Sequence, residues 1–265
     1  MFNLIKAEIY QLKTRRTPKI MLLISIISGF LIATFPQIIN FLAGNPIENG
    51  NLSITAENPG NVLAIYTIES HIMIASEIIF TTSLLILFIL TFLAFNKDLS
   101  NRTIMNPVAV GYPRWKIFFS KYVATFLYSL TFYIFLFTSF ILFNLLINGG
   151  NLKLYFDILF IDQLLPALPY WAMWQAVHMN LLFISDTGNI FIIYYIIEMI
   201  VRTGFRFIGD QISCVERLQP YLFFNFLNAE PLEVNGVNIK VLLAILYLGG
   251  FILLGVFIFN RKEIK

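Results

Sequence analysis

The residues able to do chemistry are few in this 265-residue chain, and they lie far apart. Its two histidines, His71 and His178, fall in separate apolar runs, and its single cysteine, Cys214, excludes an intrachain disulfide and a cysteine-based metal cluster. The sequence contains neither an HExxH pair nor a GxxxxGK[ST] phosphate-binding loop. A lone histidine on an apolar helix is commonly a hydrogen-bond partner between helices. We therefore predict neither a metal site nor a catalytic residue.

Charged residues inside apolar runs are a stronger indication of a site. Glu198, Arg202 and Arg206 are spaced four apart, so a helix places them on one face, where Arg202 can offset Glu198. A carboxylate near the bilayer centre costs about 2.5–3.5 kcal/mol on insertion scales and usually faces a pathway or a partner. For Glu198 we keep two interpretations, a pathway or subunit-interface residue and a structural ion pair. Glu77 is a second candidate, but a position in the headgroups explains it better.

The composition predicts a membrane protein. Hydrophobic residues make up 58% of the chain and charged residues 12%, against about 25% charged in soluble domains. The net charge of +3 is slight and the basic residues form no continuous patch, so no nucleic-acid partner is predicted. A bilayer core of ~30 Å needs ~20 helical residues. The apolar runs therefore predict one all-α transmembrane domain, 1–265, with six spans at about 20–42, 72–95, 117–147, 164–184, 189–208 and 241–259.

The segments outside these runs complete a polytopic fold. In residues 1–19, apolar positions recur every three or four residues at Phe2, Ile5, Ile9 and Leu12. This spacing predicts an amphipathic helix in the membrane interface, with a plain solvated leader as the alternative. The external segment 209–239 contains an apolar stretch too short to cross, which predicts a re-entrant or interfacial hairpin before the last span. Lys and Arg concentrate in the leader, in one loop and in the tail. Both termini of this multi-pass cell-membrane protein are therefore expected in the cytoplasm.

That loop, 96–121, lies between the second and third runs. Its basic residues are Lys97, Arg102, Arg114, Lys116 and Lys121, against Asp98 alone. Pro107 and Pro113 limit any helix within it to a turn or two. Trp and Arg are frequent anchors of protein interfaces, so Arg114 and Trp115 predict a docking turn for another protein. The alternative is a basic loop that only sets the topology.

Two stretches of this loop resemble a known family. They are Arg102-Thr103-Ile104-Met105-Asn106 and Gly111-Tyr112-Pro113-Arg114-Trp115-Lys116-Ile117, the latter followed by Ser120-Lys121. Together with the charged leader, the six runs, the long outer segment and the basic tail, they resemble the permease subunits of type 2 ABC exporters. The bacitracin-resistance and lantibiotic-immunity permeases are the most similar. Met105 and Pro113 depart from the family pattern, which commonly has a basic residue and Ser at these positions.

The resemblance implies a transport permease, not an enzyme, with no cofactor of its own. ATP and Mg would bind a separate cytoplasmic ABC ATPase subunit, docked at a coupling loop, 96–116. A second permease chain would complete a dimer lined by spans one, two and five, with the outer hairpin as a lid. The exported substrate would be an amphipathic antimicrobial peptide such as a lantibiotic, giving bacteriocin immunity or antibiotic resistance. The implied coupling residues are Arg102, Thr103, Asn106, Gly111, Arg114, Trp115 and Lys116.

Two other classes of function use the same features. A non-transporting membrane sensor or scaffold would dock a cytoplasmic partner on the same loop, and a tightly bound ATPase would distinguish the transporter from it. Glu198-x-x-x-Arg202, followed by Phe224-x-x-x-Asn228, faintly resembles the intramembrane proteases that process prenylated proteins. Those enzymes need a doubled Glu and later histidines for a metal and its water. Here residue 197 is Ile and no histidine follows His178, so we expect no protease.

Overall fold

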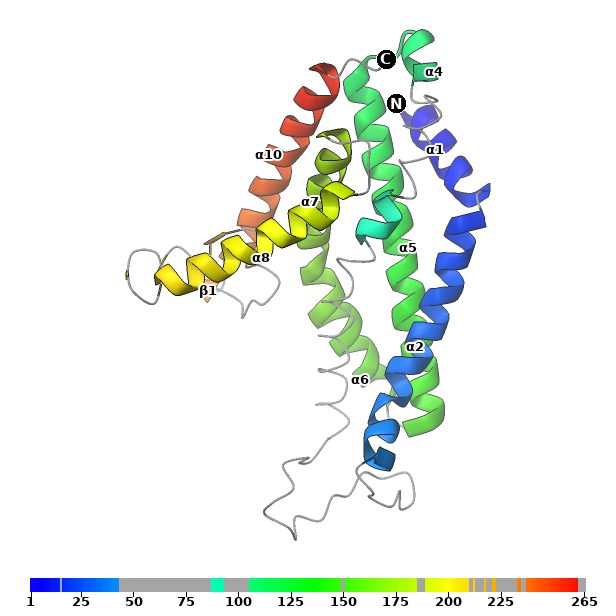
Figure 1. Ribbon diagram of the computed structural model, residues 1–265. Helices are drawn as coiled ribbons and strands as arrows, with labels where there is room; N and C mark the ends of the chain where they lie inside the picture. The colour runs from blue at the N-terminus through cyan, green and yellow to red at the C-terminus, as the bar shows by residue number, and fades with distance from the viewer. Residues whose placement is uncertain are drawn as a thin grey trace. The chain divides into compact units, whose positions relative to one another are not determined.

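The described part of the chain is helical apart from one short β ladder. The computed structural model describes residues 1–14, 16–42, 87–92, 105–148, 151–184, 189–209, 233–234 and 237–261, together with residues 212, 217, 221 and 222. Figure 1 shows the ribbon with its element labels. The predicted helical character of the fold is confirmed for these residues. Span 72–95, Glu77, His71 and the apolar stretch 218–227 fall mainly or wholly outside them.

The elements have the following bounds. The helices are α1 (Phe2–Thr14), α2 (Arg16–Leu42), α4 (Met105–Ala109), α5 (Arg114–Asn148), α6 (Leu152–Phe156), the π-helix η1 (Asp157–Leu164), α7 (Leu165–Ile184), α8 (Asn189–Gly209) and α10 (Ile239–Arg261). Residues 87–92 are also helical. The strands β1 (Glu233–Val234) and β2 (Val237–Asn238) pair in an antiparallel ladder just before α10.

Within the described residues, two helices are long and apolar enough to cross a membrane. They are α5, over Arg114–Ile147, and α10, and a third span is added if α1 and the following part of α2 form one bent span. The prediction of a membrane protein is therefore confirmed. The full set of six spans stays a prediction.

One predicted boundary differs from the observed helices. Residues 148–163 were expected as an external segment between two spans, yet residues 152–164 form α6 and η1 and lead directly into α7. The Asn151 side chain accepts a hydrogen bond from the Lys153 amide at 2.9 Å and so caps the start of α6. The fourth span was expected to begin at residue 164, yet helical structure begins at Leu152, ahead of Pro166 and Pro169. In η1 the Leu165 amide bonds to the carbonyl of Phe160, and these wider turns carry the helix into the proline-containing segment.

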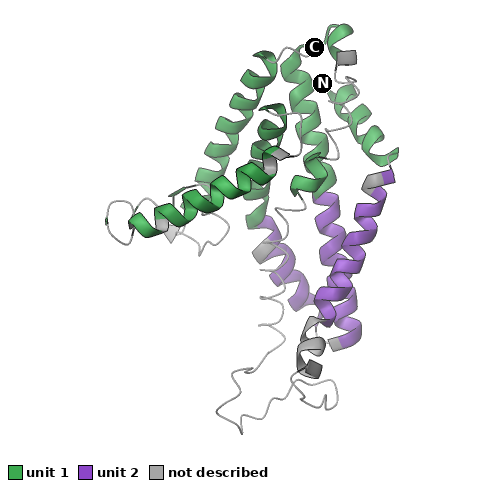
Figure 2. Ribbon diagram, viewed as in Figure 1, with its two compact units in different colours: residues 1–15, 84–129, 166–265 green, residues 16–83, 130–165 purple. Residues whose placement is uncertain are grey.

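The chain divides into two compact units, shown in Figure 2. Unit 1 contains residues 1–15, 84–129 and 166–265, and unit 2 contains residues 16–83 and 130–165. Helix α5 therefore contributes its first half to unit 1 and its second half to unit 2. The prediction of a single transmembrane domain is not tested by this division.

Unit 1 has an aromatic core where α5 begins. The ring of Phe118, in the first turns of α5, lies 5.7 Å from that of Phe183 and 6.5 Å from that of Phe259. Phe183 and Phe259 lie in the last turns of α7 and α10, and their rings are 4.8 Å apart. Helices α7 and α10 therefore end where α5 begins.

Next to this core, Gly255 allows α10 to approach α5 and α7 closely. A Cβ atom at Gly255 would overlap the Asn180 side-chain oxygen and the Phe118 ring. Asn180 Nδ2 donates a hydrogen bond to the Phe251 carbonyl at 2.8 Å, which joins α7 to α10. Small residues combined with interhelical hydrogen bonds are the usual means of packing helices in membranes, where lipid and apolar side chains are equally apolar.

Unit 2 packs α2 against the second half of α5 in a similar way. Ser25, Gly29 and Ala33 are buried and spaced four apart on one side of α2. Ser139 Oγ donates to the Ser25 carbonyl at 3.3 Å and to the Leu136 carbonyl at 2.9 Å. A Cβ atom at Gly29 would overlap Ser139 Oγ, so only glycine permits this contact.

The distribution of side chains reverses that of a soluble protein. Exposed positions on the long helices are apolar, such as Leu146 in α5 and Leu253 in α10. Fully or almost fully buried positions in α7 include Gln175, His178 and Asn180. Soluble domains rarely bury so many polar side chains in one helix, whereas membrane helices turn them away from lipid.

Candidate functional site

The loop before α5 contains a turn that requires glycine. Gly111 has φ +93°, follows the end of α4, and donates its amide to the Val108 carbonyl at 2.9 Å. The Tyr112 amide donates to the Pro107 carbonyl at 3.0 Å. These two bonds form a Schellman cap, in which a left-handed residue closes a helix. The prediction of a helix limited to a turn or two is confirmed by α4.

Arg114 forms hydrogen bonds within the chain. Its Nη1 donates to the carbonyls of Phe259 at 3.3 Å and Asn260 at 2.9 Å. The last carbonyls of a helix have no intrahelical partner and carry partial negative charge, so a guanidinium is well suited to cap them. The sequence predicted Arg114 as a docking residue for another protein. The structure places its guanidinium on the C-terminal end of α10.

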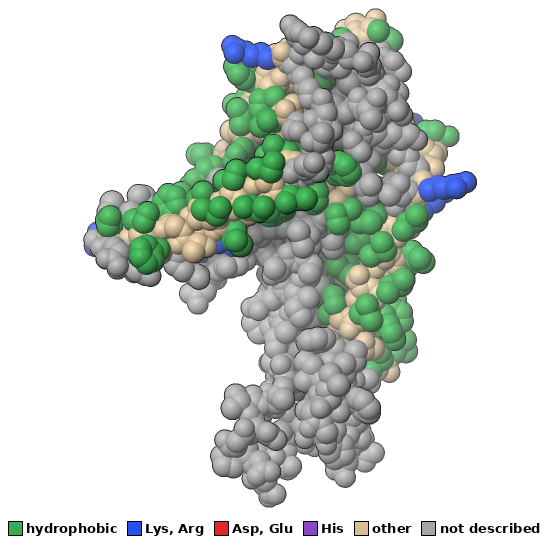
Figure 3. Space-filling view, viewed as in Figure 1, with side chains coloured by type: hydrophobic (Ala, Val, Ile, Leu, Met, Phe, Trp, Pro, Cys, Tyr) green, Lys and Arg blue, Asp and Glu red, His purple; other side chains and the backbone are tan. Residues whose placement is uncertain are grey.

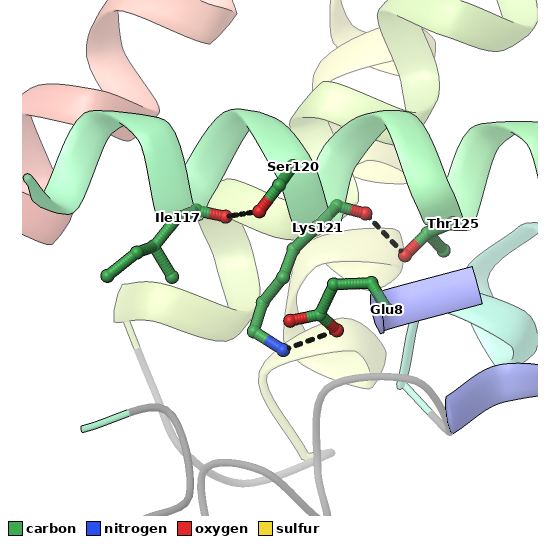
Figure 4. Close-up of polar contacts among 5 residues, drawn as sticks. All are labelled: Glu8, Ile117, Ser120, Lys121 and Thr125. Atoms are coloured by element: carbon green, nitrogen blue, oxygen red, sulfur yellow. Dashed lines mark hydrogen bonds and ion pairs between the residues drawn. The ribbon is translucent and has the colours of Figure 1, made fainter. Parts of the chain in front are cut away.

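Lys121 also forms an ion pair within the chain, with Glu8. Its Nζ lies 2.8 Å from Glu8 Oε2 of α1, and the two side chains are only 5% and 13% exposed. In Figure 4 the two side chains point toward one another across α1 and α5. The hydroxyls of Ser120 and Thr125 donate to carbonyls of α5 itself, at 2.8 Å each. Glu8 is therefore the residue that holds α1 to the start of α5.

Beside these internal contacts, two exposed side chains and a half-buried lysine form a small group at the loop. Val110 is 77% exposed and Trp115 is 46% exposed. Lys116 Nζ lies 5.5 Å from the centre of the Trp115 ring, a cation–π arrangement. We call Val110, Trp115 and Lys116 the loop surface. An apolar side chain, an aromatic ring and a cation together suit a protein contact.

The remaining predicted loop residues are described only in part. Arg102 and Thr103 lie outside the described residues, and Asn106 belongs to α4. The role of each in coupling stays a prediction.

A buried polar network lies elsewhere in unit 1. Gln175 Nε2 of α7 donates to Thr91 Oγ1 at 2.8 Å, and Thr91 donates in turn to the Leu87 carbonyl at 2.6 Å. His178 Nε2 lies 3.2 Å from the Tyr195 hydroxyl of α8. The prediction that His178 is a hydrogen-bond partner between helices is confirmed.

Helix α8 adds the ion pair expected from the spacing of its charges. Arg202 Nη2 lies 2.7 Å from Glu198 Oε1, and Glu198 is buried. The Glu198 carboxylate also lies beside the Tyr194 side chain of the same helix. Arg206 belongs to α8 as well. The interpretation of Glu198 as a structural ion pair agrees with this contact, and the pathway interpretation is untested.

The surface of α8 has the opposite character. Most of its exposed residues are apolar, with Thr203 a polar exception: Ile192, Ile193, Ile196, Ile197, Met199, Ile200, Phe207 and Ile208. Figure 3 shows many hydrophobic side chains along the visible side of this helix. Within unit 1, α8 runs obliquely to α5 and α10 rather than alongside them (Figure 1). A helix with polar side chains inside and apolar ones outside is suited to contact with lipid.

The structure gives contacts to three residues that the sequence did not single out: Glu8, Gly255 and Tyr195. The sequence predicted no partner for Glu8 and no contact for Gly255 or Tyr195. Small residues recur every four positions at Ser25, Gly29 and Ala33, and this spacing in the sequence indicates a closely packed helix face. No pattern in the sequence indicates the partner of Glu8.

In the described part of the chain, no group of three or more His, Cys, Asp or Glu residues is placed to hold a metal ion. A comparison with protein families finds no match for the chain, and a comparison with curated proteins finds none either.

Proposed function

We propose that this protein is the membrane-spanning permease subunit of an ATP-driven exporter, powered by a separate ATPase. The loop surface carries the proposal. Val110, Trp115 and Lys116 are presented beside a glycine-capped turn, next to contacts with α10 and α1. A partner that presses on this surface acts on three helices at once.

The mechanism follows from these contacts. Closure of two ATPase subunits on ATP binding displaces the loop surface and the start of α5. Arg114 passes the displacement to the end of α10, and Lys121 passes it to α1 through Glu8. The 34-residue candidate span of α5 is about 51 Å long at 1.5 Å per residue, which carries the motion through a ~30 Å bilayer core.

The proposed topology has six spans with both termini in the cytoplasm. The directions of the helices support this topology, because α5 begins in unit 1 at the place where α7 and α10 end. Alternating crossings place the leader, the loop and the tail on the same side of the membrane. The proposed assembly is a dimer of permease chains, in which Glu198 and Arg202 lie toward a pathway or the subunit interface.

The proposed substrate is an amphipathic antimicrobial peptide expelled from the membrane. It rests on the resemblance of the loop to lantibiotic-immunity and bacitracin-resistance permeases. The non-transporting scaffold would use the same loop surface, and the choice between them is made by whether the docked protein hydrolyses ATP.

The test is purification of the tagged chain from its native cells in mild detergent, with ATP hydrolysis measured in the presence and absence of a lantibiotic. Truncation of a central interface anchor typically costs about 2 kcal/mol or more, which is about thirtyfold in affinity. The Trp115→Ala/Lys116→Ala variant should therefore lose bound ATPase activity while the chain still inserts. Leu146→Ala, an exposed apolar truncation near the other end of α5, is the matched control and should keep it.

Unchanged lantibiotic-stimulated ATP hydrolysis in the Trp115→Ala/Lys116→Ala variant would refute the coupling role of the loop surface. A docked protein without ATP hydrolysis would instead favour the scaffold and overturn the exporter.

A further inference from the structure

Helix α1 presents one continuous face away from the protein. Leu12 is buried and Glu8 is turned toward Lys121, so these two residues define the inward side. Beside the exposed Asn3, Ala7, Gln11 and Thr14, five exposed residues carry aromatic, aliphatic or basic side chains: Phe2, Lys6, Ile9, Tyr10 and Lys13. At 100° per residue these five positions fall within an arc of about 100°, on a different side from Glu8. We call them the α1 stripe.

The α1 stripe combines two chemistries. Phe2 is 85% exposed and Tyr10 is 69% exposed, so both aromatic rings lie on the outward side of α1. Lys6 and Lys13 lie between them, with long apolar stems that end in ammonium groups. Aromatic rings at headgroup depth with lysines reaching toward phosphates are typical of helices that lie in a membrane interface.

The ion pair with Lys121 gives this face a single sign of charge. Glu8 is the only acidic residue of α1. Its carboxylate is bound to Lys121 at 2.8 Å on the inward side. The outward side of α1 therefore presents positive charge alone, and the same contact fixes which side of the helix is outward.

The depth of the contact also fits a headgroup layer. The apolar span of α5 runs from Arg114 to Ile147, so its middle lies near Leu130. At 1.5 Å per residue, Lys121 lies about 14 Å from that middle. The half-thickness of a hydrocarbon core is ~15 Å. If α5 is centred in the bilayer, Glu8 and α1 lie at the boundary between acyl chains and phosphates.

From this geometry we propose that the α1 stripe binds anionic lipid headgroups and thereby holds the start of α5 at the surface of the anionic leaflet. The inference goes beyond the proposed export function and does not depend on it. Each lysine close to an anionic surface strengthens binding by about fivefold, so Lys6 and Lys13 together contribute about thirtyfold.

The test is hydrogen exchange of the α1 amides in the full-length protein, in nanodiscs of phosphatidylcholine alone and of phosphatidylcholine with phosphatidylglycerol. Exchange in residues 2–14 should be up to about thirtyfold slower with phosphatidylglycerol, and the difference should shrink at high salt because exposed charges are screened. Inorganic phosphate added to phosphatidylcholine discs should not reproduce it.

The variant Lys6→Gln/Lys13→Gln should lose the dependence on phosphatidylglycerol. Lys153→Gln removes an exposed lysine from α6 and should keep it. Both changes are at exposed positions and leave the Glu8–Lys121 pair intact. Equal exchange of native α1 in the two lipids, or a full lipid dependence in the double variant, would overturn the proposal.

Discussion

The packing at Gly255 gives the sharpest test of how α10 is held in unit 1. Replacing Gly255 by Ala places a Cβ atom into the Asn180 side chain and the Phe118 ring. Gly249 and Gly250 lie in the same helix, and a Cβ atom at either meets nothing within 4 Å. Gly249→Ala is therefore a matched control with the same chemical change in the same element.

The expected magnitude follows from three contributions. Alanine is favoured over glycine in a helix by about 1 kcal/mol, and this gain is common to both variants. Overpacking at Gly255 costs about 1–3 kcal/mol. Loss of the 2.8 Å bond from Asn180 to the Phe251 carbonyl adds about 0.6 kcal/mol, and up to about 1.7. Gly255→Ala should therefore be about 2–4 kcal/mol less stable than Gly249→Ala.

The measurement is the free energy of unfolding in mixed micelles titrated with a denaturing detergent. Phe118→Leu in the Gly255→Ala background removes part of the ring that the new methyl group meets. It should recover part of the loss, with a coupling energy of about 0.5–3 kcal/mol. Stability of Gly255→Ala within about 0.5 kcal/mol of Gly249→Ala would refute the close packing of α10.

Two further predictions concern the loop and α1. Gly111→Ala forces a side chain into the positive-φ conformation and should cost about 1–2 kcal/mol in the same titration. Gly204→Ala, in open space on α8, should stabilise by up to about 1 kcal/mol. Equal effects of the two changes would contradict the Schellman cap. Glu8→Gln and Lys121→Gln each leave a buried charge without its partner and should each cost about 3–5 kcal/mol, while the double change should cost less than their sum. Additive losses in that cycle would show that the ion pair does not hold α1 to α5.

Local features of the fold were predictable because their causes are local. Apolar runs set the extents of α5, α8 and α10 to within a few residues. Pro107 and Gly111 determine a short helix and its closing turn through backbone preferences alone. The Glu198–Arg202 contact joins residues one helical turn apart, so its spacing was sufficient to predict it.

The roles of the loop's charges were not predictable in this way. The sequence of a polar loop predicts that its basic side chains are exposed. Arg114 and Lys121 were therefore expected to face the cytoplasm or a partner. Their partners lie more than a hundred positions away in the sequence, at Asn260 and Glu8. Which carbonyl or carboxylate a long side chain reaches depends on the packing of helices. The loop surface therefore contains fewer residues than the docking turn predicted from the sequence, because Arg114 and Lys121 bind partners within the chain.

The glycines of α10 show what the sequence determines and what only the tertiary structure determines. By itself the sequence determined an apolar helix over about residues 241–259, within the observed α10, because hydropathy and length are properties of the segment. It presented Gly249, Gly250 and Gly255 as equivalent interruptions of that run. Only the tertiary structure decided that Gly255 lies against Phe118 and Asn180 while the other two face open space. The physical reason is that a missing side chain matters only where another helix occupies the space it leaves.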